Sequence, residues 1–252
     1  NHVKLKKSNA MEVFLMDVHS ISTKCTRTEF VGTAVLDTIG LVISGVDDTL
    51  LNEMNIGTRY HTLGLFSSRT GAAGQITAVD DAVKATGTEV LSIEFPRDTK
   101  GWGGHGNYIV IGGNDVSDVR HAISLALELT NKYAGELYIS ESGHLEFAFS
   151  ANAGGALAMA FHAVPGEAFG FMAGSPAAIG LVMADTAMKA SAVHITRYMT
   201  PSIGTSHSNE VILAISGDAS AVKEAVLQAR QIGLELLIGM GSYPEIPGEP
   251  YL

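Results

Sequence analysis

The chain has 252 residues, a formal net charge of −10 and a sequence pI near 5.3. Acidity of this kind opposes binding to nucleic-acid phosphates, and no run of Lys or Arg is interleaved with aromatic residues, so we expect no nucleic-acid partner. No apolar stretch approaches the roughly 20 residues that cross a bilayer, and the first residues lack the hydrophobic region of a signal peptide, which predicts a soluble cytosolic protein with no membrane partner.

Residues 1–27 are predicted to form an N-terminal extension. They are polar, basic at first, and only residues 13–16 are apolar enough to anchor the segment. Cys25 is the single cysteine of the chain, so no intramolecular disulfide forms. We interpret it as an incidental thiol, with cross-linking or metal sharing at a symmetry axis as the alternative.

Residues 28–133 are predicted to form the first of two domains. Short apolar runs bounded by turn residues predict strands, and apolar residues spaced i, i+3, i+4 and i+7 over 119–127 predict a long final helix. The predicted strands are 29–31, 40–43, 63–66, 89–95 and 107–112, with a short helix near 47–54 and a further helix that carries Asp80 and Lys84.

Residues 134–238 are predicted to repeat this order as a second domain. Residues 239–252 are expected to form an extended tail, because Pro244, Pro247 and Pro250 forbid a continuing helix. The order of strands and helices indicates an α+β sandwich with helices on one sheet and mixed strand pairing in each domain. The predicted strands are 136–139, 145–149, 169–172, 194–199 and 211–216, and the helices lie near 154–161, around 185–189 and over 222–229.

The two domains are expected to be copies of one unit. An Asp-x-x-x-Lys motif recurs 105 residues later, so that Asp80 corresponds to Asp185 and Lys84 to Lys189. Each pair is spaced to form a weak surface ion pair on a helix, and the small residues around it also fit a flat edge where particles abut. Two copies related by a rotation build a pseudosymmetric object, so we expect function in an assembly.

A glycine-rich loop at 101–106 formally matches G-x-G-x-x-G, the dinucleotide fingerprint. These glycines lead into a strand, whereas the fingerprint requires a helix, which weighs against a nucleotide site. The equivalent loop at 201–208 is also small and polar. Such loops suit a hydrated aperture for small polar solutes, with a solvated surface loop as the alternative. The candidate aperture-lining residues are Lys100, Gly101, Trp102, Gly103, Gly104, His105, Ile203, Gly204, Thr205, Ser206 and His207.

The sequence contains no pattern that specifies catalysis. It has no HExxH motif, no paired His/Cys ligand spacing and no G-x-S-x-G elbow. The adjacent Ser206 and His207 do not make a triad, because folding brings catalytic partners together. We therefore expect no catalytic residue, no metal and no cofactor.

Strings at 170–171, 184–190 and 216–226 resemble, in order and spacing, the domain of bacterial microcompartment (BMC) shell proteins. The first copy departs more, at 113–115, where the family commonly has Gly-Asp. Because a hairpin and a short helix precede the family pattern, each copy resembles the circularly permuted form of the domain. The strings that narrow the resemblance to the B-type shell proteins of propanediol- and ethanol-utilisation compartments lie at 28–35, 96–101, 204–206 and 208–210.

This resemblance implies a ferredoxin-like α/β sandwich in each copy and a homotrimer that imitates a hexagonal tile, with six domains around one axis. Such tiles pack edge to edge with other shell proteins. The resemblance also implies loops 97–106 and 202–208 nearest the axis, N-terminal hairpins that cap it as a small barrel, and small channels within or between domains. The implied tile-edge contacts are Asp80, Lys84, Asp185 and Lys189.

We therefore expect a non-enzymatic structural protein of a microcompartment shell in the cytoplasm. It would tile the shell facet and pass small polar metabolites of the ethanol, propanediol or glycerol class, while it retards the leakage of aldehydes. The alternative is a small-molecule-binding regulatory trimer that does not tile. A third option is a metal-dependent or nucleotide-dependent enzyme.

Overall fold

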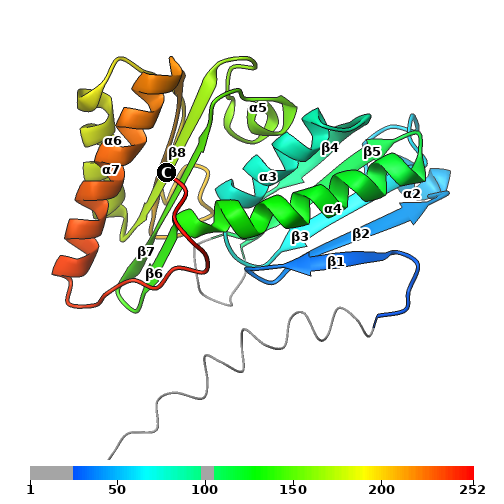
Figure 1. Ribbon diagram of the computed structural model, residues 1–252, viewed down its shortest axis with the longest axis horizontal. Coiled ribbons are helices and arrows are strands. Elements are labelled where there is room, and N and C mark those ends of the chain that lie inside the picture. Colours follow the sequence, from blue (N-terminus) through cyan, green and yellow to red (C-terminus); the bar gives the residue numbers. More distant parts are fainter. Residues whose placement is uncertain (1–24, 98–104) are drawn as a thin grey trace, which may run out of the picture.

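The computed structural model describes residues 25–97 and 105–252, and within them the chain forms two five-stranded sheets (Figure 1). The predicted anchoring patch at 13–16 lies outside the described residues. The first copy comprises β1 (Phe30–Ala34), β2 (Thr38–Ser44), α2 (Asp48–Glu53), β3 (Thr62–Ser68), α3 (Ala73–Lys84), β4 (Thr88–Glu94), β5 (Asn107–Gly113) and α4 (Val116–Tyr133). The second comprises a 3-10 turn (Ala134–Glu136), β6 (Leu137–Ser140), β7 (Gly143–Ser150), α5 (Gly155–Phe161), β8 (Ala168–Ser175), α6 (Ala177–Ala190), β9 (His194–Met199), β10 (Val211–Gly217) and α7 (Ala219–Gly239).

The two sheets have the same strand order, β1-β2-β3-β5-β4 and β6-β7-β8-β10-β9. All neighbouring strands in these sheets are antiparallel, so the predicted mixed pairing is wrong. The reason lies in the crossover through α3. This connection leaves a gap of one strand between β3 and β4, which run parallel to each other. Strand β5 then fills the gap and runs antiparallel to both of them. The expected α+β architecture, with one sheet per copy, is confirmed.

Two helices cover one face of each sheet, α3 and α4 in the first copy and α6 and α7 in the second (Figure 1). The apolar stripe predicted over 119–127 is buried on α4, and its counterpart over 222–229 is buried on α7. Close packing of helix on strand requires glycine on the facing strands. A Cβ on Gly64 would lie 2.9 Å from Ile123, and one on Gly170 would lie 2.8 Å from Val226.

The C-terminal tail leaves α7 without forming a further helix and packs back onto the second copy (Figure 1). Glu245 bridges to Ile139 through two backbone hydrogen bonds of 2.7 and 2.8 Å. The buried carboxylate of Glu136 accepts hydrogen bonds from the backbone N–H groups of Tyr251 (2.8 Å) and Leu252 (2.9 Å). The tail is therefore held by buried acceptors and not only by surface contacts.

No helix within residues 25–97 or 105–252 combines the length and apolar character needed to cross a membrane.

Candidate functional site

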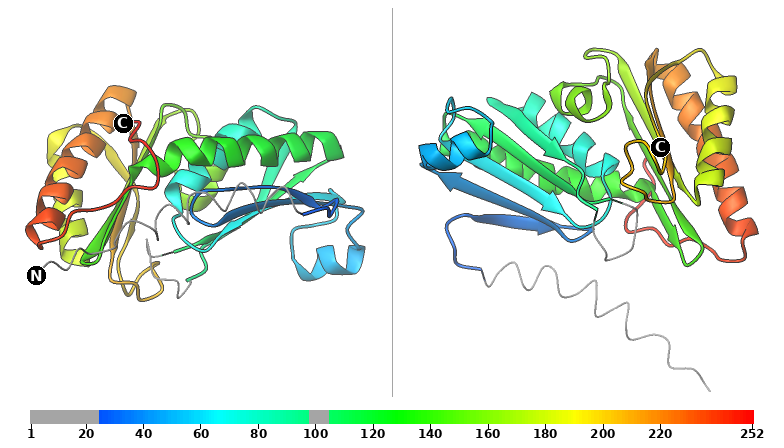
Figure 2. Two further views of the ribbon diagram at one scale, coloured as in Figure 1. Left: turned by 60° about the horizontal axis from the view of Figure 1, so that its bottom comes forward. Right: turned by 180° about the vertical axis from the view of Figure 1, so that it is seen from behind.

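The two copies meet along an internal junction, where α3 and β4 of the first copy pack against α5 and β7 of the second (Figures 1 and 2). The apolar part of this junction is one continuous buried cluster. Phe161 of α5 lies within it, with its ring centroid 5.6 Å from Phe95, 5.6 Å from Phe169 and 4.9 Å from Phe171. Aromatic rings bury large areas, so the junction is part of the core of the chain.

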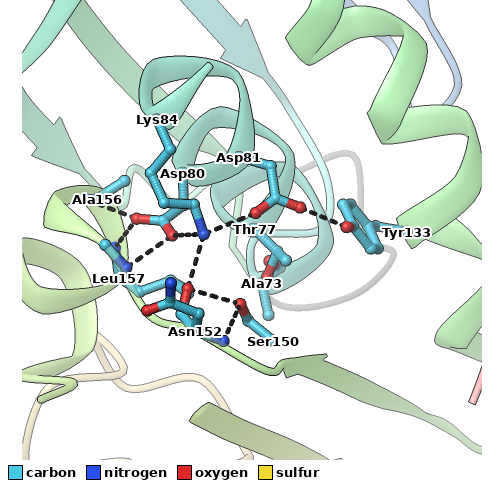
Figure 3. A network of polar contacts seen from close by, with 11 residues as sticks. Ala73, Thr77, Asp80, Asp81, Lys84, Tyr133, Ser150, Asn152, Ala156 and Leu157 are labelled. Atoms are coloured by element: carbon cyan, nitrogen blue, oxygen red, sulfur yellow. Dashed lines mark hydrogen bonds and ion pairs between the residues drawn. The ribbon is translucent and has the colours of Figure 1, made fainter. Parts of the chain in front are cut away.

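Asp80 on α3 is buried and bonds to the second copy (Figure 3). Its carboxylate accepts hydrogen bonds from the backbone N–H groups of Gly154 (2.8 Å), Ala156 (3.0 Å) and Leu157 (3.2 Å). The N-cap residue of α5, Gly154, offers no side-chain acceptor, so Asp80 supplies it from the other copy. The predicted surface position of Asp80 is therefore wrong. The predicted ion pair with Lys84 does form, at 3.1 Å, but the carboxylate of Asp80 is buried between the two copies.

Lys84 completes this contact from the rim of the junction (Figure 3). Its Nζ lies 2.8 Å from Asp81 Oδ1 and donates a hydrogen bond of 2.7 Å to the carbonyl of Asn152. Burial alone would lower the pKa of Lys84, but the hydrogen bond to Asp81 and the charge of Asp80 outweigh it and raise the pKa. The ammonium therefore stays charged where the two copies touch.

The equivalent pair of the second copy lies at the surface. Lys189 Nζ is 2.6 Å from Asp185 Oδ2, and both side chains are exposed on α6. The contacts with neighbouring tiles expected for these residues, and for Asp80 and Lys84, stay a prediction.

Glu146 on β7 makes the reciprocal contact, from the second copy to the first. One oxygen of its buried carboxylate accepts hydrogen bonds from the N–H groups of Ala72 (3.1 Å), Ala73 (2.8 Å) and Gly74 (3.3 Å), at the start of α3. Helix α3 has no side-chain cap of its own. Burial raises the pKa of Glu146, although the three N–H groups oppose that shift. Each copy thus caps a helix of the other with a carboxylate.

A small cavity lies at this junction and is walled by both copies. It encloses about 20 Å³, which is about the room that one water molecule needs. Its wall is mostly apolar and aromatic, with one imidazole and two carboxylates. The lining residues are Ala72, Phe95, His105, Glu146, Phe161, Phe171, Ala173, Met199, Gly204, Glu210 and Ile212.

Glu210, just before β10, joins two histidines at this cavity. His105 Nδ1 lies 2.8 Å from Glu210 Oε1, and His144 Nε2 lies 3.2 Å from Glu210 Oε2. Burial alone would raise the pKa of Glu210, but the hydrogen bonds and charges of the two histidines outweigh it and lower the pKa to about 2. Glu210 is therefore a carboxylate at neutral pH that lies between the two rings and accepts a hydrogen bond from the ring of His144.

The second ring nitrogen of His105 is buried and has no hydrogen-bond partner among the described residues. Glu210 Oε1, which lies 2.8 Å from Nδ1 of the same ring, is also buried without a hydrogen-bond partner, so both atoms are left for another group. A buried polar atom without a partner carries a cost of about 1–3 kcal/mol, which a bound hydroxyl or water would remove. His105 lines the cavity, so the arrangement can bind a small hydroxyl-bearing molecule.

The structure separates the predicted aperture residues. His105 and Gly204 reach the cavity, whereas Ile203 is 65% exposed. Thr205 is buried, and its hydroxyl donates a hydrogen bond of 2.8 Å to the carbonyl of Thr200. Ser206 and His207 are exposed in the same turn. Lys100, Gly101, Trp102, Gly103 and Gly104 lie outside the described residues.

Sequence reasoning missed Glu146 and Glu210. Neither belongs to a motif of ligand or catalytic residues, although Glu210 ends the string 208–210 on which the family resemblance partly rests. Glu146 leaves one signal, since it is an acidic residue inside the apolar strand β7. A charge in such a strand indicates a buried partner. Within residues 25–97 and 105–252, no three His, Cys, Asp or Glu side chains are placed to hold a metal ion.

Comparison with known proteins gives a consistent result. The BMC domain model matches residues 62–142 and 168–244. The chain is 50% identical over 228 residues to the bacterial microcompartment shell protein PduB of Salmonella typhimurium, across 90% of this chain and 84% of that protein. It is 46% identical over 225 residues to PduB of Limosilactobacillus reuteri, across 89% of this chain and 94% of that protein.

Two solved structures resemble the whole described fold. One is a trimeric bacterial microcompartment shell protein PduB, with a TM-score of 0.87, 46% identity and coverage of 90% of this chain and 100% of that one. The other is EtuB from Clostridium kluyveri, with a TM-score of 0.87, 44% identity and the same coverage.

Proposed function

Since the chain belongs to the BMC-domain family of bacterial microcompartment shell proteins, we propose that the cavity at its internal junction admits small polar solutes through the shell. The role of the chain is structural. It is a component of a microcompartment shell within the bacterial cytoplasm, and its trimeric relatives support a homotrimer as the unit that packs with other shell proteins. These relatives do not favour a regulatory trimer that does not tile.

The observation that carries the proposed passage is the buried, unpartnered Nε2 of His105 in a cavity walled by both copies. A small alcohol or diol needs a hydrogen-bond partner for its hydroxyl and apolar contact for its carbon atoms. His105 offers the first, and Phe95, Phe161 and Met199 offer the second. Ethanol, propanediol and glycerol all have this chemistry.

The cavity has a volume of about 20 Å³, which is room for about one water molecule. A diol therefore requires a wall to move. Met199 is the candidate, because its flexible thioether side chain packs against Gly204, where a Cβ would lie 2.8 Å from Met199 Cγ.

A second candidate passage is the axis of the trimer. The loop 202–208 presents the exposed Ile203, Ser206 and His207, and Arg97 of the first copy donates a hydrogen bond of 3.0 Å to the carbonyl of Ser206. A loop tied to both copies in this way suits a fixed aperture. We infer that these residues face the axis, as the resemblance implies.

The two passages are distinguished by flux through assembled shells. His105→Phe should fill the junction cavity and slow consumption of 1,2-propanediol by an enzyme enclosed in the shell. His121→Phe, on the exposed side of α4, is the matched control and should leave the rate unchanged. In broken shells, the enzyme should consume 1,2-propanediol at the same rate for all variants, because the shell no longer limits access to it. Unchanged flux with His105→Phe and slower flux with Ile203→Trp would move the passage to the axis.

A further inference from the structure

The cavity at the internal junction contains two atoms that no described residue satisfies. His105 Nε2 and Glu210 Oε1 are both buried without a hydrogen-bond partner, and the two side chains are 7% and 3% exposed. The negative charge of Glu210, 2.8 Å from Nδ1 of the imidazole, favours the tautomer that carries its proton on Nδ1. Nε2 is then an acceptor, as is the carboxylate oxygen. A hydroxyl has one hydrogen to donate, so it satisfies only one of the two atoms.

The wall of the cavity carries negative charge. Glu146 and Glu210 line it, and no Lys or Arg is among the described residues that do so. Glu146 already gives one oxygen to the N–H groups at the start of α3, whereas Glu210 Oε1 is unpartnered. His105 and His144, the two basic groups beside Glu210, carry positive charge only when protonated. A buried carboxylate without a cation is costly, so the cavity favours a cationic occupant.

The size and the aromatic wall of the cavity narrow the choice of cation. The volume of about 20 Å³ has room for an occupant of about the size of a water molecule. Ammonium has this size and a tetrahedral set of N–H donors, whereas hard metal cations donate no hydrogen bond and prefer oxygen ligands to an imidazole nitrogen. The rings of Phe95, Phe161 and Phe171 also line the cavity, and aromatic faces attract ammonium groups.

We propose that this cavity binds an ammonium ion, which donates hydrogen bonds to Glu210 Oε1 and to His105 Nε2. The inference rests on the proposed function, because the ion occupies the same cavity as a passing alcohol. The cavity holds one small occupant at a time, so the two exclude each other. Ammonium therefore competes with alcohols and diols for this passage.

Thermal unfolding at neutral pH, in ammonium chloride and in potassium chloride of equal ionic strength, tests the binding. A ligand that binds only the folded chain raises the unfolding midpoint, so the midpoint should be a few degrees higher in saturating ammonium chloride. Glu210→Gln should abolish this difference, whereas Glu235→Gln, on the exposed side of α7, should keep it. Equal midpoints of the native chain in the two salts would overturn the inference. A difference that survives in Glu210→Gln would overturn it as well.

A measurement on the native chain does not depend on the folding of any variant. Isotope-labelled ammonium in the cavity should give an NMR signal whose hydrogens exchange with water more slowly than those of the free ion. Addition of 1,2-propanediol should remove that signal. A spectrum that shows only the free ion at saturating ammonium would contradict the inference.

Flux through assembled shells separates this inference from the proposed function. Ammonium chloride should slow consumption of 1,2-propanediol by an enclosed enzyme, relative to potassium chloride, after each rate is divided by that of broken shells in the same salt. Slower flux in His105→Phe with no bound ammonium would overturn the ion site and leave the passage standing. Bound ammonium, with flux that neither the ion nor His105→Phe changes, would overturn the passage and leave the ion site standing.

Discussion

Helices α3 and α6 carry the same motif in opposite surroundings. Asp80 and Lys84 are 1% and 33% exposed, at the internal junction, whereas Asp185 and Lys189 are 58% and 73% exposed. The same two residue types at the same spacing thus belong to the interior in one copy and to the surface in the other. The packing around the motif, and not the motif itself, decides its interactions.

This contrast has an energetic consequence. Asp80 is buried and accepts hydrogen bonds from three backbone N–H groups at the start of α5, while the side chains of Asp185 and Lys189 are both exposed to solvent. Hydrogen bonds to a charged acceptor contribute about 1.5–3 kcal/mol, and exposed ion pairs about 0–1 kcal/mol. Matched substitutions in the two copies should therefore have unequal effects.

Asp80→Asn should have the largest effect on this comparison. It removes a charged acceptor from the start of α5, so the free energy of unfolding should fall by about 3 kcal/mol. The matched Asp185→Asn should lower it by about 0.5 kcal/mol or less, because that carboxylate is exposed. Urea denaturation of the two variants measures both values. Equal losses would contradict the assignment of Asp80 to the interior.

Acid should weaken the junction next most strongly, through Glu210. Its pKa in the folded chain is lowered to about 2 from an ordinary value of 4.5, so its stabilisation is complete above pH 4.5 and is lost as the pH falls toward 2. The difference between the two pKa values corresponds to a loss of about 3 kcal/mol. Glu210→Gln should flatten that part of the stability profile. A profile unchanged by Glu210→Gln would show that the two histidines do not hold this carboxylate.

Glu146→Ala should have an intermediate effect. It leaves the first N–H groups of α3 without an acceptor and should cost about 1.5 kcal/mol, within the range for lost helix caps. The matched control is Ile39, the residue of the first copy at the position equivalent to Glu146: Ile39 pairs with Ser67 across the sheet as Glu146 pairs with Ala173. The side chain of Ile39 is exposed. Ile39→Ala should cost about 0.5 kcal/mol or less in thermal or urea unfolding. If Ile39→Ala lowered the free energy of unfolding by more than this, the side chain of Ile39 would have to be buried against another chain.

Lys189→Ala should have the smallest effect on the chain itself. Removal of an exposed ion pair should change the free energy of unfolding by about 0.5 kcal/mol or less. If Lys189 contacts adjacent tiles as predicted, the same variant should lose ordered sheets in electron microscopy at concentrations where the native chain forms them. Sheets of unchanged order and spacing would remove Lys189 from the tile edge.

Much of the fold is predictable because its signals are local or repeated. The apolar stripe over 119–127 and its twin over 222–229 identify the long helices, and the recurrent Asp-x-x-x-Lys motif identifies the duplication. Strand neighbours are a long-range property. No local pattern states that β5 returns between β3 and β4, which is why mixed pairing is expected from the sequence and antiparallel pairing is found.

The site is less predictable than the fold. His105 and Gly204 stand out as loop residues, but their shared cavity depends on Glu146 and Glu210, two isolated acidic residues. Asp80 is predictable as part of a repeat, yet its burial arises only when α5 of the other copy packs onto it. Contacts between copies are tertiary, so sequence spacing within either copy does not contain them.

The proposal that a small polar solute occupies the internal junction is tested most directly by a high-resolution structure of the assembled particle with saturating 1,2-propanediol or glycerol. We predict solute density in the cavity, with a hydroxyl within hydrogen-bonding distance of His105 Nε2 and with Met199 displaced from the position that it has here. An empty cavity, with solute density confined to the loop 202–208, would contradict the proposal.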